Sequence, residues 1–382
     1  MNNVIALPKT DNINNRFNIY SGSNPSLNNN SSNNPNSNGV VETAFSFYLG
    51  FGKANRQMST NINQVKRLQK DFAQIGYHID SAIAYEVNNW YELNNQPLLV
   101  QGGPGTGKTT FAEWLAKIKG LKYYRFQCYP GVQAKDVLYW WNERLQDLLT
   151  KVAYAGSSTN ISEIKRLIYH QDCRIDGTFA RALLDSSPSI IHLDEIDKAD
   201  PKFEAALLQV TAEAKITIGE TDEEIKAISG IRPRIIFTSN AGAHGMRVSL
   251  SQPLLRRCKF IKLHKPSIIR QYLVLKDKFP ELSDNLLREC VIFSYQVDEF
   301  VCMEKPVDLS EIINWMHSLR HSGATVLSWE TVSANIGDLA KTDLDKDNLL
   351  SSVNKIFDYI KEHSDIDIRA LSDMVERNTK KR

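Results

Sequence analysis

Residues 102–109 read GGPGTGKT, and this stretch decides the fold class. It fits the pattern G-x-x-x-x-G-K-[ST], with Gly102 and Gly107 as the fixed glycines, followed by Lys108 and Thr109. Glycines let backbone N–H groups turn inward around phosphate oxygens, and a helix that starts at the loop adds a partial positive charge. An apolar run directly before the loop and a helical pattern directly after it provide the context that the motif requires. The stretch therefore predicts a triphosphate-binding loop.

The predicted phosphate site takes in the whole loop and the start of the following helix. Lys108 would reach the β- and γ-phosphates, and the Thr109 hydroxyl would ligate Mg²⁺. A glycine-rich loop that only turns the chain is the competing interpretation, which the flanking strand and helix disfavour. The predicted nucleotide-binding residues here are Gly102, Gly103, Pro104, Gly105, Thr106, Gly107, Lys108, Thr109 and Thr110.

Two later apolar strands end in polar side chains that suit hydrolysis. SIIHLDE ends in Asp194 and Glu195, and RIIFTSN ends in Asn240. A carboxylate at the end of a strand beside the phosphate-loop strand can hold Mg²⁺, which suits Asp194, and Glu195 could polarise a water. Asn240 would position that water. The alternatives are an acidic helix N-terminus for the pair and an ordinary turn for Asn240.

Short apolar runs alternate with longer helical runs, which predicts a mostly parallel, doubly wound α/β sheet. After Pro266 only helical patterns follow. We therefore expect a disordered Asn/Ser-rich tail over 1–42, an α/β nucleotide-binding domain over 43–265 and a helical lid with further C-terminal helices over 266–382. The predicted strands are 97–101, 122–128, 189–193, 234–239 and 259–263. Helical runs are expected over 108–119 and 135–154.

The composition of the chain limits the classes of partner that it could bind. The chain has 382 residues, 42 % of them apolar, and a net charge of +2, which gives no global attraction to nucleic acid or anionic lipid. No apolar run approaches the roughly 18 residues that span a bilayer. The five cysteines are scattered and form no CxxC pair, which predicts reduced thiols in a cytoplasm.

These motifs together resemble the AAA+ ATPases, and among them the MoxR-like branch with its CoxD-type ATPases. The resemblance covers about 75–320. Its most specific segments are FQCYPGVQAKDVLYWWN and SLSQPLLRRCKFIKLHKP. It implies a five-stranded parallel sheet in the order 5-1-4-3-2, a C-terminal helical lid, ATP and Mg²⁺ as ligands, and a homo-oligomeric ring, usually a hexamer.

The resemblance also implies an arginine finger that reaches the γ-phosphate of the neighbouring subunit. Arg257 aligns best with it and Arg256 is the second choice, while a solvated surface pair is the alternative. Many AAA+ lids carry an arginine that senses the γ-phosphate. Here Lys305 stands at the nearest position, and its interpretation as an ordinary surface lysine is equally good. The branch further implies a hairpin before the Asn240 strand and a second insertion near 170–179. Tyr77 and His78 could border the adenine.

The implied function is ATP-driven, chaperone-like remodelling or maturation of a protein complex, with a von Willebrand factor A domain protein as a candidate partner. One alternative is a nucleic-acid-associated motor like the McrB-type proteins, which use GTP. The uncharged N-terminal tract disfavours this alternative, and it also disfavours nucleic acid as a partner. Another is a non-hydrolysing nucleotide switch or scaffold, which Glu195 and Asn240 argue against.

Overall fold

The computed structural model describes residues 55–93, 96–156, 160–228, 230–240, 250–364 and 366–379. The tail predicted to be disordered, 1–42, lies outside these ranges. The chain divides into a unit Met1–Arg56 and a unit Gln57–Arg382. The description below concerns the second unit.

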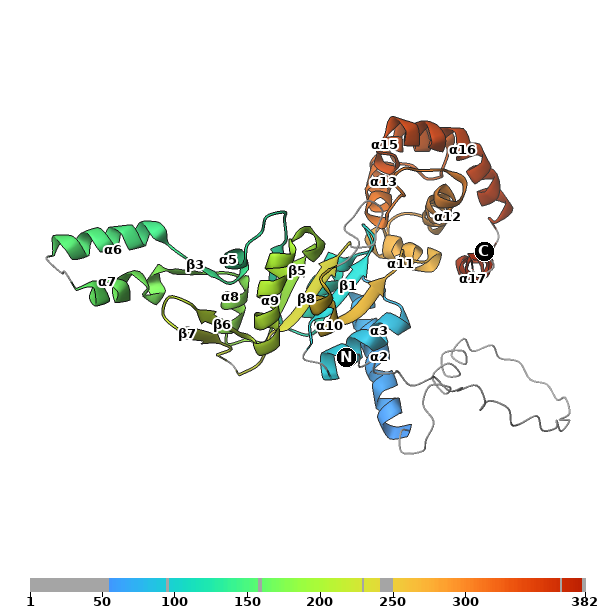
Figure 1. Ribbon diagram of the computed structural model, residues 1–382. Coiled ribbons are helices and arrows are strands. Elements are labelled where there is room, and N and C mark those ends of the chain that lie inside the picture. Colours follow the sequence, from blue (N-terminus) through green and yellow to red (C-terminus); the bar gives the residue numbers. More distant parts are fainter. Residues whose placement is uncertain are drawn as a thin grey trace, which may run out of the picture. The chain divides into compact units, whose positions relative to one another are not determined.

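A five-stranded parallel sheet forms the centre of this unit (Figure 1). Its strand order is β2-β5-β8-β1-β9. Numbered along the chain as core strands one to five, this order is 2-3-4-1-5, so the predicted order is confirmed. The strands are β1 (Leu98–Gly102), β2 (Lys122–Gln127), β5 (Ser189–Asp194), β8 (Arg234–Ser239) and β9 (Lys259–Leu263).

The central strands are apolar on both faces because helices cover both. Every residue of β5 is buried. Successive side chains alternate between two cores: Ile190 lies in one, together with Ile236, and Ile191 lies in the other, together with Phe237. The flanking helices are α2 (Asn55–Gln74), α3 (Ser81–Leu93), α4 (Lys108–Ile118), α5 (Ala134–Val137), α8 (Thr178–Leu184), α9 (Pro201–Glu213) and α10 (Gln252–Arg257).

An insertion lies between α5 and α8, and a strand at Tyr139–Trp141 interrupts the helix that was expected over 135–154. β3 (Tyr139–Trp141) pairs antiparallel with β4 (Arg174–Asp176). Aromatic side chains favour a pleated strand, and this pairing satisfies the backbone that a helix would otherwise use. Between the strands lie α6 (Glu143–Ala155), α7 (Ile161–Ile168) and the short turn η1 (Gln171–Cys173), and Figure 1 shows α6 and α7 extending beyond the edge of the sheet. The second insertion expected near 170–179 is thus the return arm of a longer one.

A second hairpin lies before the Asn240 strand. β6 (Lys215–Ile218) and β7 (Glu223–Lys226) pair antiparallel, which confirms the predicted hairpin. A short 3-10 turn, η2 (Ile196–Lys198), leads from β5 into α9.

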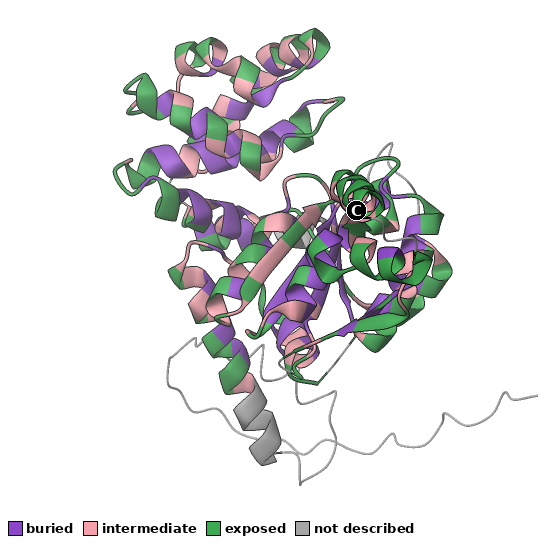
Figure 2. Ribbon diagram, turned by 90° about the vertical axis from the view of Figure 1, so that its left-hand side faces the viewer, coloured by how far each residue is buried: buried purple, intermediate pink, exposed green. Residues whose placement is uncertain are grey.

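The chain ends in helices around a separate core. Trp315, Phe293 and Leu349 are among its fully buried side chains, and Figure 2 shows buried residues along the inner sides of these helices. None of the helices in the described residues is long and apolar enough to cross a membrane. The C-terminal helices are α11 (Ile268–Lys278), α12 (Asp284–Phe300), α13 (Leu309–His321), α14 (Trp329–Ala334), α15 (Ile336–Leu339), α16 (Asp343–Glu362) and α17 (Ile368–Thr379).

Candidate functional site

The predicted phosphate loop joins β1 to α4 and has the backbone of an anion cradle. Gly105 and Gly107 have φ angles of 66° and 84°, in the left-handed region that favours glycine. Lys108 is 8 % exposed, and its Nζ donates to the Gly103 carbonyl at 2.6 Å. Burial lowers the pKa of Lys108, while the surrounding carboxylates, Asp194 first among them, oppose that shift. The loop therefore holds one buried ammonium beside its backbone N–H groups.

Asp194, the last residue of β5, contacts Thr109 in the first turn of α4. The Thr109 hydroxyl lies 3.1 Å and 3.0 Å from the two carboxylate oxygens of Asp194. Burial raises the pKa of Asp194, but hydrogen bonds from Thr238, Arg125 and Thr109, together with nearby His192, outweigh it and keep the pKa below its usual value. A hydroxyl and an ionised carboxylate side by side are hard oxygen ligands, the kind that Mg²⁺ prefers. This pair fits the predicted metal ligands.

Arg125 also binds Asp194, and the sequence did not predict it. Its Nη2 and Nε lie 2.6 Å and 3.1 Å from Asp194 Oδ2. Arg125 is opposite His192 in the register of β2 and β5, and Gln127 is opposite Asp194. The strand KYYRFQ alone gives no signal of this contact, because only the register places Arg125 beside the carboxylate.

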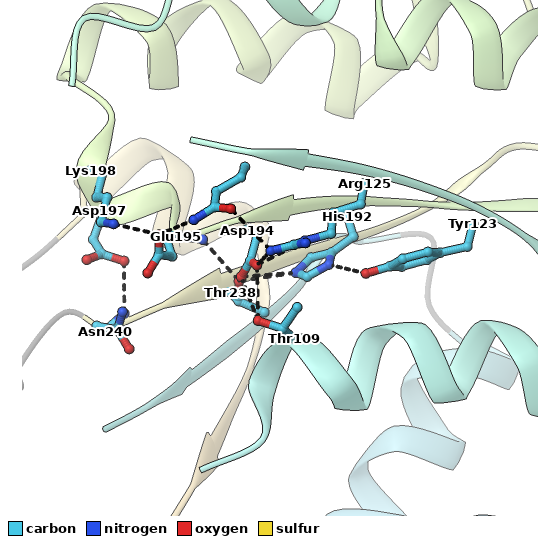
Figure 3. Close-up of polar contacts among 11 residues, drawn as sticks. Thr109, Tyr123, Arg125, His192, Asp194, Glu195, Asp197, Lys198, Thr238 and Asn240 are labelled. Carbon is cyan, nitrogen blue, oxygen red and sulfur yellow. Dashed lines mark hydrogen bonds and ion pairs between the residues drawn. The ribbon is translucent and has the colours of Figure 1, made fainter. Parts of the chain in front are cut away.

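Glu195 adopts a backbone conformation that is uncommon for a residue with a side chain. Its φ and ψ are 56° and 47°, a left-handed conformation that costs of order 1–3 kcal/mol and is often found at functional sites. Its Oε2 accepts a hydrogen bond from Gln127 Nε2 at 2.9 Å. The same oxygen accepts from Lys198 Nζ at 2.6 Å (Figure 3). The turn thus separates the Glu195 carboxylate from that of Asp194, although the two residues are adjacent in sequence.

Asn240 is held by its backbone, and its side-chain oxygen is an unpaired acceptor among the described residues. Its N–H donates to Asp197 Oδ1 at 2.8 Å (Figure 3). Its side-chain Oδ1 is buried and has no hydrogen-bond partner within the described part of the chain. Asp197, which the sequence did not single out, therefore anchors the end of β8 beside β5.

A cavity of about 680 Å³ lies between the phosphate loop and the loop that leads into α13. Lys305 lines it and is exposed, so its role as a lid sensor stays a prediction. Asp308, the N-cap of α13, lies directly against Gly105. Two further lysines, Lys262 and Lys265, line the same cavity, and Lys265 is paired with Asp298.

We expect Gly105→Ala to weaken ATP binding by about tenfold. The φ of 66° would cost an alanine roughly 1–2 kcal/mol, and its Cβ would lie 2.3 Å from Asp308 Cγ. Titration with a fluorescent ATP analogue measures the effect. Gly120→Ala is the matched control because Gly120 has a φ of 63° but nothing within 4 Å of an added Cβ. Equal affinities in the two variants would contradict the role of the Gly105 contact.

Tyr77 connects the phosphate loop to the lid. Its hydroxyl donates to the Gly107 carbonyl at 3.2 Å, and the guanidinium of Arg270, from α11, lies 5.5 Å from the Tyr77 ring centre. Burial raises the pKa of Tyr77 to about 12, so the hydroxyl keeps its proton. The neighbouring His78 contacts Asp277 of the same lid helix at 2.7 Å. Both residues therefore link the lid to the segment before α3.

Arg256 and Arg257 lie at the C-terminal end of α10. Both are exposed, and neither forms an ion pair or a hydrogen bond with another described residue. The structure does not bring them into the cluster formed by Lys108, Thr109 and Asp194.

Two comparisons with known proteins bear on this site. Residues 97–258 match the family described as AAA domain (dynein-related subfamily). Uncharacterized proteins of Staphylococcus aureus strains USA300, NCTC 8325 / PS 47 and COL are similar to the chain. Each is 23 % identical over 235 residues, which is 61 % of this chain and 78 % of the relative. Residues 97–258 are therefore similar to an AAA domain, and the parallel sheet with its flanking helices and C-terminal helical region is an α/β P-loop AAA+ fold with a helical lid.

Proposed function

We propose that this protein binds ATP with Mg²⁺ and hydrolyses it, and that a ring of its subunits uses the energy to remodel a protein complex. The observation that carries the proposal is the convergence of Lys108, Thr109 and Asp194, with Glu195 and Asn240 at the ends of neighbouring strands. A chain that only bound nucleotide as a scaffold would have no use for the last two groups.

Each group has a distinct task in this proposal. The loop N–H groups and Lys108 hold the phosphates, and Thr109 and Asp194 would hold Mg²⁺, which neutralises phosphate charge when bound. Glu195 accepts a proton from the attacking water once its contacts with Gln127 and Lys198 are released. The free Oδ1 of Asn240 accepts a hydrogen bond from the same water and orients it.

Arg257 would complete the site of a neighbouring subunit. An exposed guanidinium without a partner in its own described chain is available to an anion outside it, and the γ-phosphate of the next protomer is the anion that the AAA+ resemblance implies. The charge that develops in phosphoryl transfer makes such an arginine worth 10³–10⁵ in rate. Arg256 is the second choice for this role.

The two insertions are the proposed contact with the protein client. Tyr139 joins them, because its hydroxyl accepts from Gly219 N at 3.2 Å and donates to Glu220 Oε2 at 3.1 Å. α6 buries none of its residues and leaves Leu148 and Val152, one turn apart, largely exposed. The MoxR-like resemblance makes a cytoplasmic protein complex, with a von Willebrand factor A domain partner, the proposed client class.

Replacement of Lys108 tests nucleotide use directly. Lys108→Ala should lower the affinity for ATP by about 10- to 100-fold, because it removes one charged hydrogen bond to the phosphates. Equilibrium binding and phosphate release with Mg²⁺ and ATP measure both effects. Lys117→Ala is the matched control, since Lys117 is an exposed lysine on the same helix. A Lys108→Ala protein that binds and hydrolyses ATP like the control would refute the proposed function.

A further inference from the structure

His192 is a histidine in the middle of β5, fully buried at 0 % exposure, and the proposed reaction does not use it. Both of its ring nitrogens have partners. Nε2 lies 3.1 Å from the Thr238 hydroxyl oxygen, and Nδ1 lies 2.6 Å from the Tyr123 hydroxyl (Figure 3). Burying a polar ring in a fully buried strand is costly unless each polar atom is satisfied, and both ring nitrogens of His192 are satisfied here.

Thr238 connects the histidine to both acidic residues of the site. Its hydroxyl donates to Asp194 Oδ1, and its oxygen accepts from the Glu195 N–H at 3.1 Å. Thr238 lies on β8, next to β5 in the sheet. A single hydroxyl therefore contacts the side chain of the proposed metal ligand and the backbone of the proposed base.

The proton positions along this chain follow from the number of donors. Thr238 has one hydroxyl proton, and the ionised Asp194 can only accept, so that proton lies between them. The contact with His192 must then use a proton on Nε2. Its Nδ1 is then an acceptor, because the Tyr123 hydroxyl beside it at 2.6 Å has one proton and no other hydrogen-bond partner in the described chain. Tyr123 supplies that last proton, because burial raises the pKa of its hydroxyl.

The result is a chain of hydrogen bonds with one direction: Tyr123 donates to His192, His192 donates to Thr238, and Thr238 donates to Asp194. Because each group accepts one hydrogen bond from the group before it, its own proton can only go to the group after it. Without the His192 proton, the Thr238 hydroxyl could turn toward the ring nitrogen and leave Asp194. Chains of this kind strengthen each member and hold one arrangement against alternatives.

We propose that Tyr123 and His192 are positioning residues that act through Thr238 to fix the Asp194 carboxylate and the left-handed turn at Glu195 for metal-dependent ATP hydrolysis. This inference rests on the proposed function. The inference assigns this series of hydrogen bonds to the binding of Mg²⁺. Loss of one of its residues should weaken the dependence of the reaction on Mg²⁺ but leave nucleotide binding by the phosphate loop unchanged.

Paired substitutions separate this role from simple packing. Thr238→Val keeps the shape and removes the hydroxyl, whereas Thr238→Ser keeps the hydroxyl. His192→Phe keeps a flat ring without nitrogens, and Tyr123→Phe removes one oxygen. Thr211→Val is the control, because Thr211 is also a buried threonine and its hydroxyl donates only to the Leu208 carbonyl within α9.

Two readouts are measured for each variant. The first is the Mg²⁺ concentration that half-saturates ATP hydrolysis, together with kcat. The second needs no turnover: it is the affinity for a fluorescent, non-hydrolysable ATP analogue with and without Mg²⁺. Thermal unfolding is recorded alongside.

Thr238→Val should raise the half-saturating Mg²⁺ concentration by about tenfold and reduce the Mg²⁺ enhancement of analogue binding, because one hydrogen bond to a charged group is lost. His192→Phe should act in the same direction by a smaller factor, and Tyr123→Phe by a smaller one still. Thr238→Ser and Thr211→Val should behave like the parent. The double variant Thr238→Val/His192→Phe should be no worse than Thr238→Val, since the histidine acts through the hydroxyl.

Unchanged Mg²⁺ dependence in His192→Phe and Tyr123→Phe, or additive losses in the double variant, would overturn the proposal and leave His192 a packing residue. If His192→Phe does not fold, the Mg²⁺ dependence of Tyr123→Phe tests the proposal, because this variant keeps the aromatic ring at position 123 and its packing. The parent protein separates the two hypotheses. If it does not bind the analogue, the proposed function fails; if it binds and the variants match it, only the positioning chain fails.

Discussion

Glu195→Gln is expected to lower kcat for ATP hydrolysis by about 10²–10⁴-fold while ATP binding stays near that of the parent protein. The amide keeps the size of the side chain and its contact with Lys198, but it cannot take a proton from water. Asp194, Thr109 and Lys108 are untouched, so the nucleotide remains held. Steady-state phosphate release and equilibrium ATP binding, measured on the same preparation, give the two quantities.

Glu213→Gln is the matched control for this experiment. Glu213 is an exposed glutamate at the C-terminal end of α9, and its only ion pair in the described chain is with Lys215. Equal turnover in Glu195→Gln and the parent would show that Glu195 is not the base. The same variant should retain its client during purification because the ATP-bound state persists, and the co-purifying protein identifies the client class.

Arg257→Ala is expected to lower hydrolysis by about 10³–10⁵-fold without loss of ATP binding by the isolated subunit. The exposed guanidinium forms no ion pair or hydrogen bond within its own described chain. In the proposed function it contacts the γ-phosphate bound by the next subunit. The decisive measurement is therefore a mixture. Lys108→Ala subunits and Arg257→Ala subunits, each inactive alone, should regain part of the activity together, since some interfaces then combine an intact phosphate loop with an intact arginine.

Arg256→Ala serves as the control with the same change of charge. A larger loss in Arg256→Ala than in Arg257→Ala would make Arg256 the finger. Mixed subunits that stay inactive, although size-exclusion chromatography shows that they co-assemble, would contradict catalysis across an interface. Full activity in both Arg256→Ala and Arg257→Ala would also contradict catalysis across an interface.

Much of the site could be predicted because its residues are adjacent along the chain or stand at strand ends. The loop GGPGTGKT specifies its own backbone through its glycines, and the apolar runs that end in Asp194 and Asn240 are buried strands as predicted. The ends of parallel strands share one edge of a sheet, so their polar ends were expected to converge. The helical region after Pro266 followed from periodicity alone.

The helix expected over 135–154 is interrupted at Tyr139–Trp141 for a physical reason. Tyr139–Trp141 has the spacing of a helix within its own segment, but its strand partner lies at Arg174–Asp176, after α6 and α7. A pairing across that distance is decided by tertiary contacts and not by local periodicity.

The sequence by itself determined the glycine-rich loop and the parallel sheet, because these depend on local backbone preference or on strands that must be buried. The proposed base and the proposed amide were predicted from their places at strand ends, and the arginines from the family resemblance. The tertiary structure decided what surrounds them: Arg125 on Asp194, Asp197 on the Asn240 backbone, and the line from Tyr123 through His192 to Thr238. The contact of Arg125 and the line from Tyr123 to Thr238 join residues of three different strands, and only the register between neighbouring strands sets which side chains face each other. Asp197 lies in the turn after β5, and its contact depends on where β8 ends beside that turn.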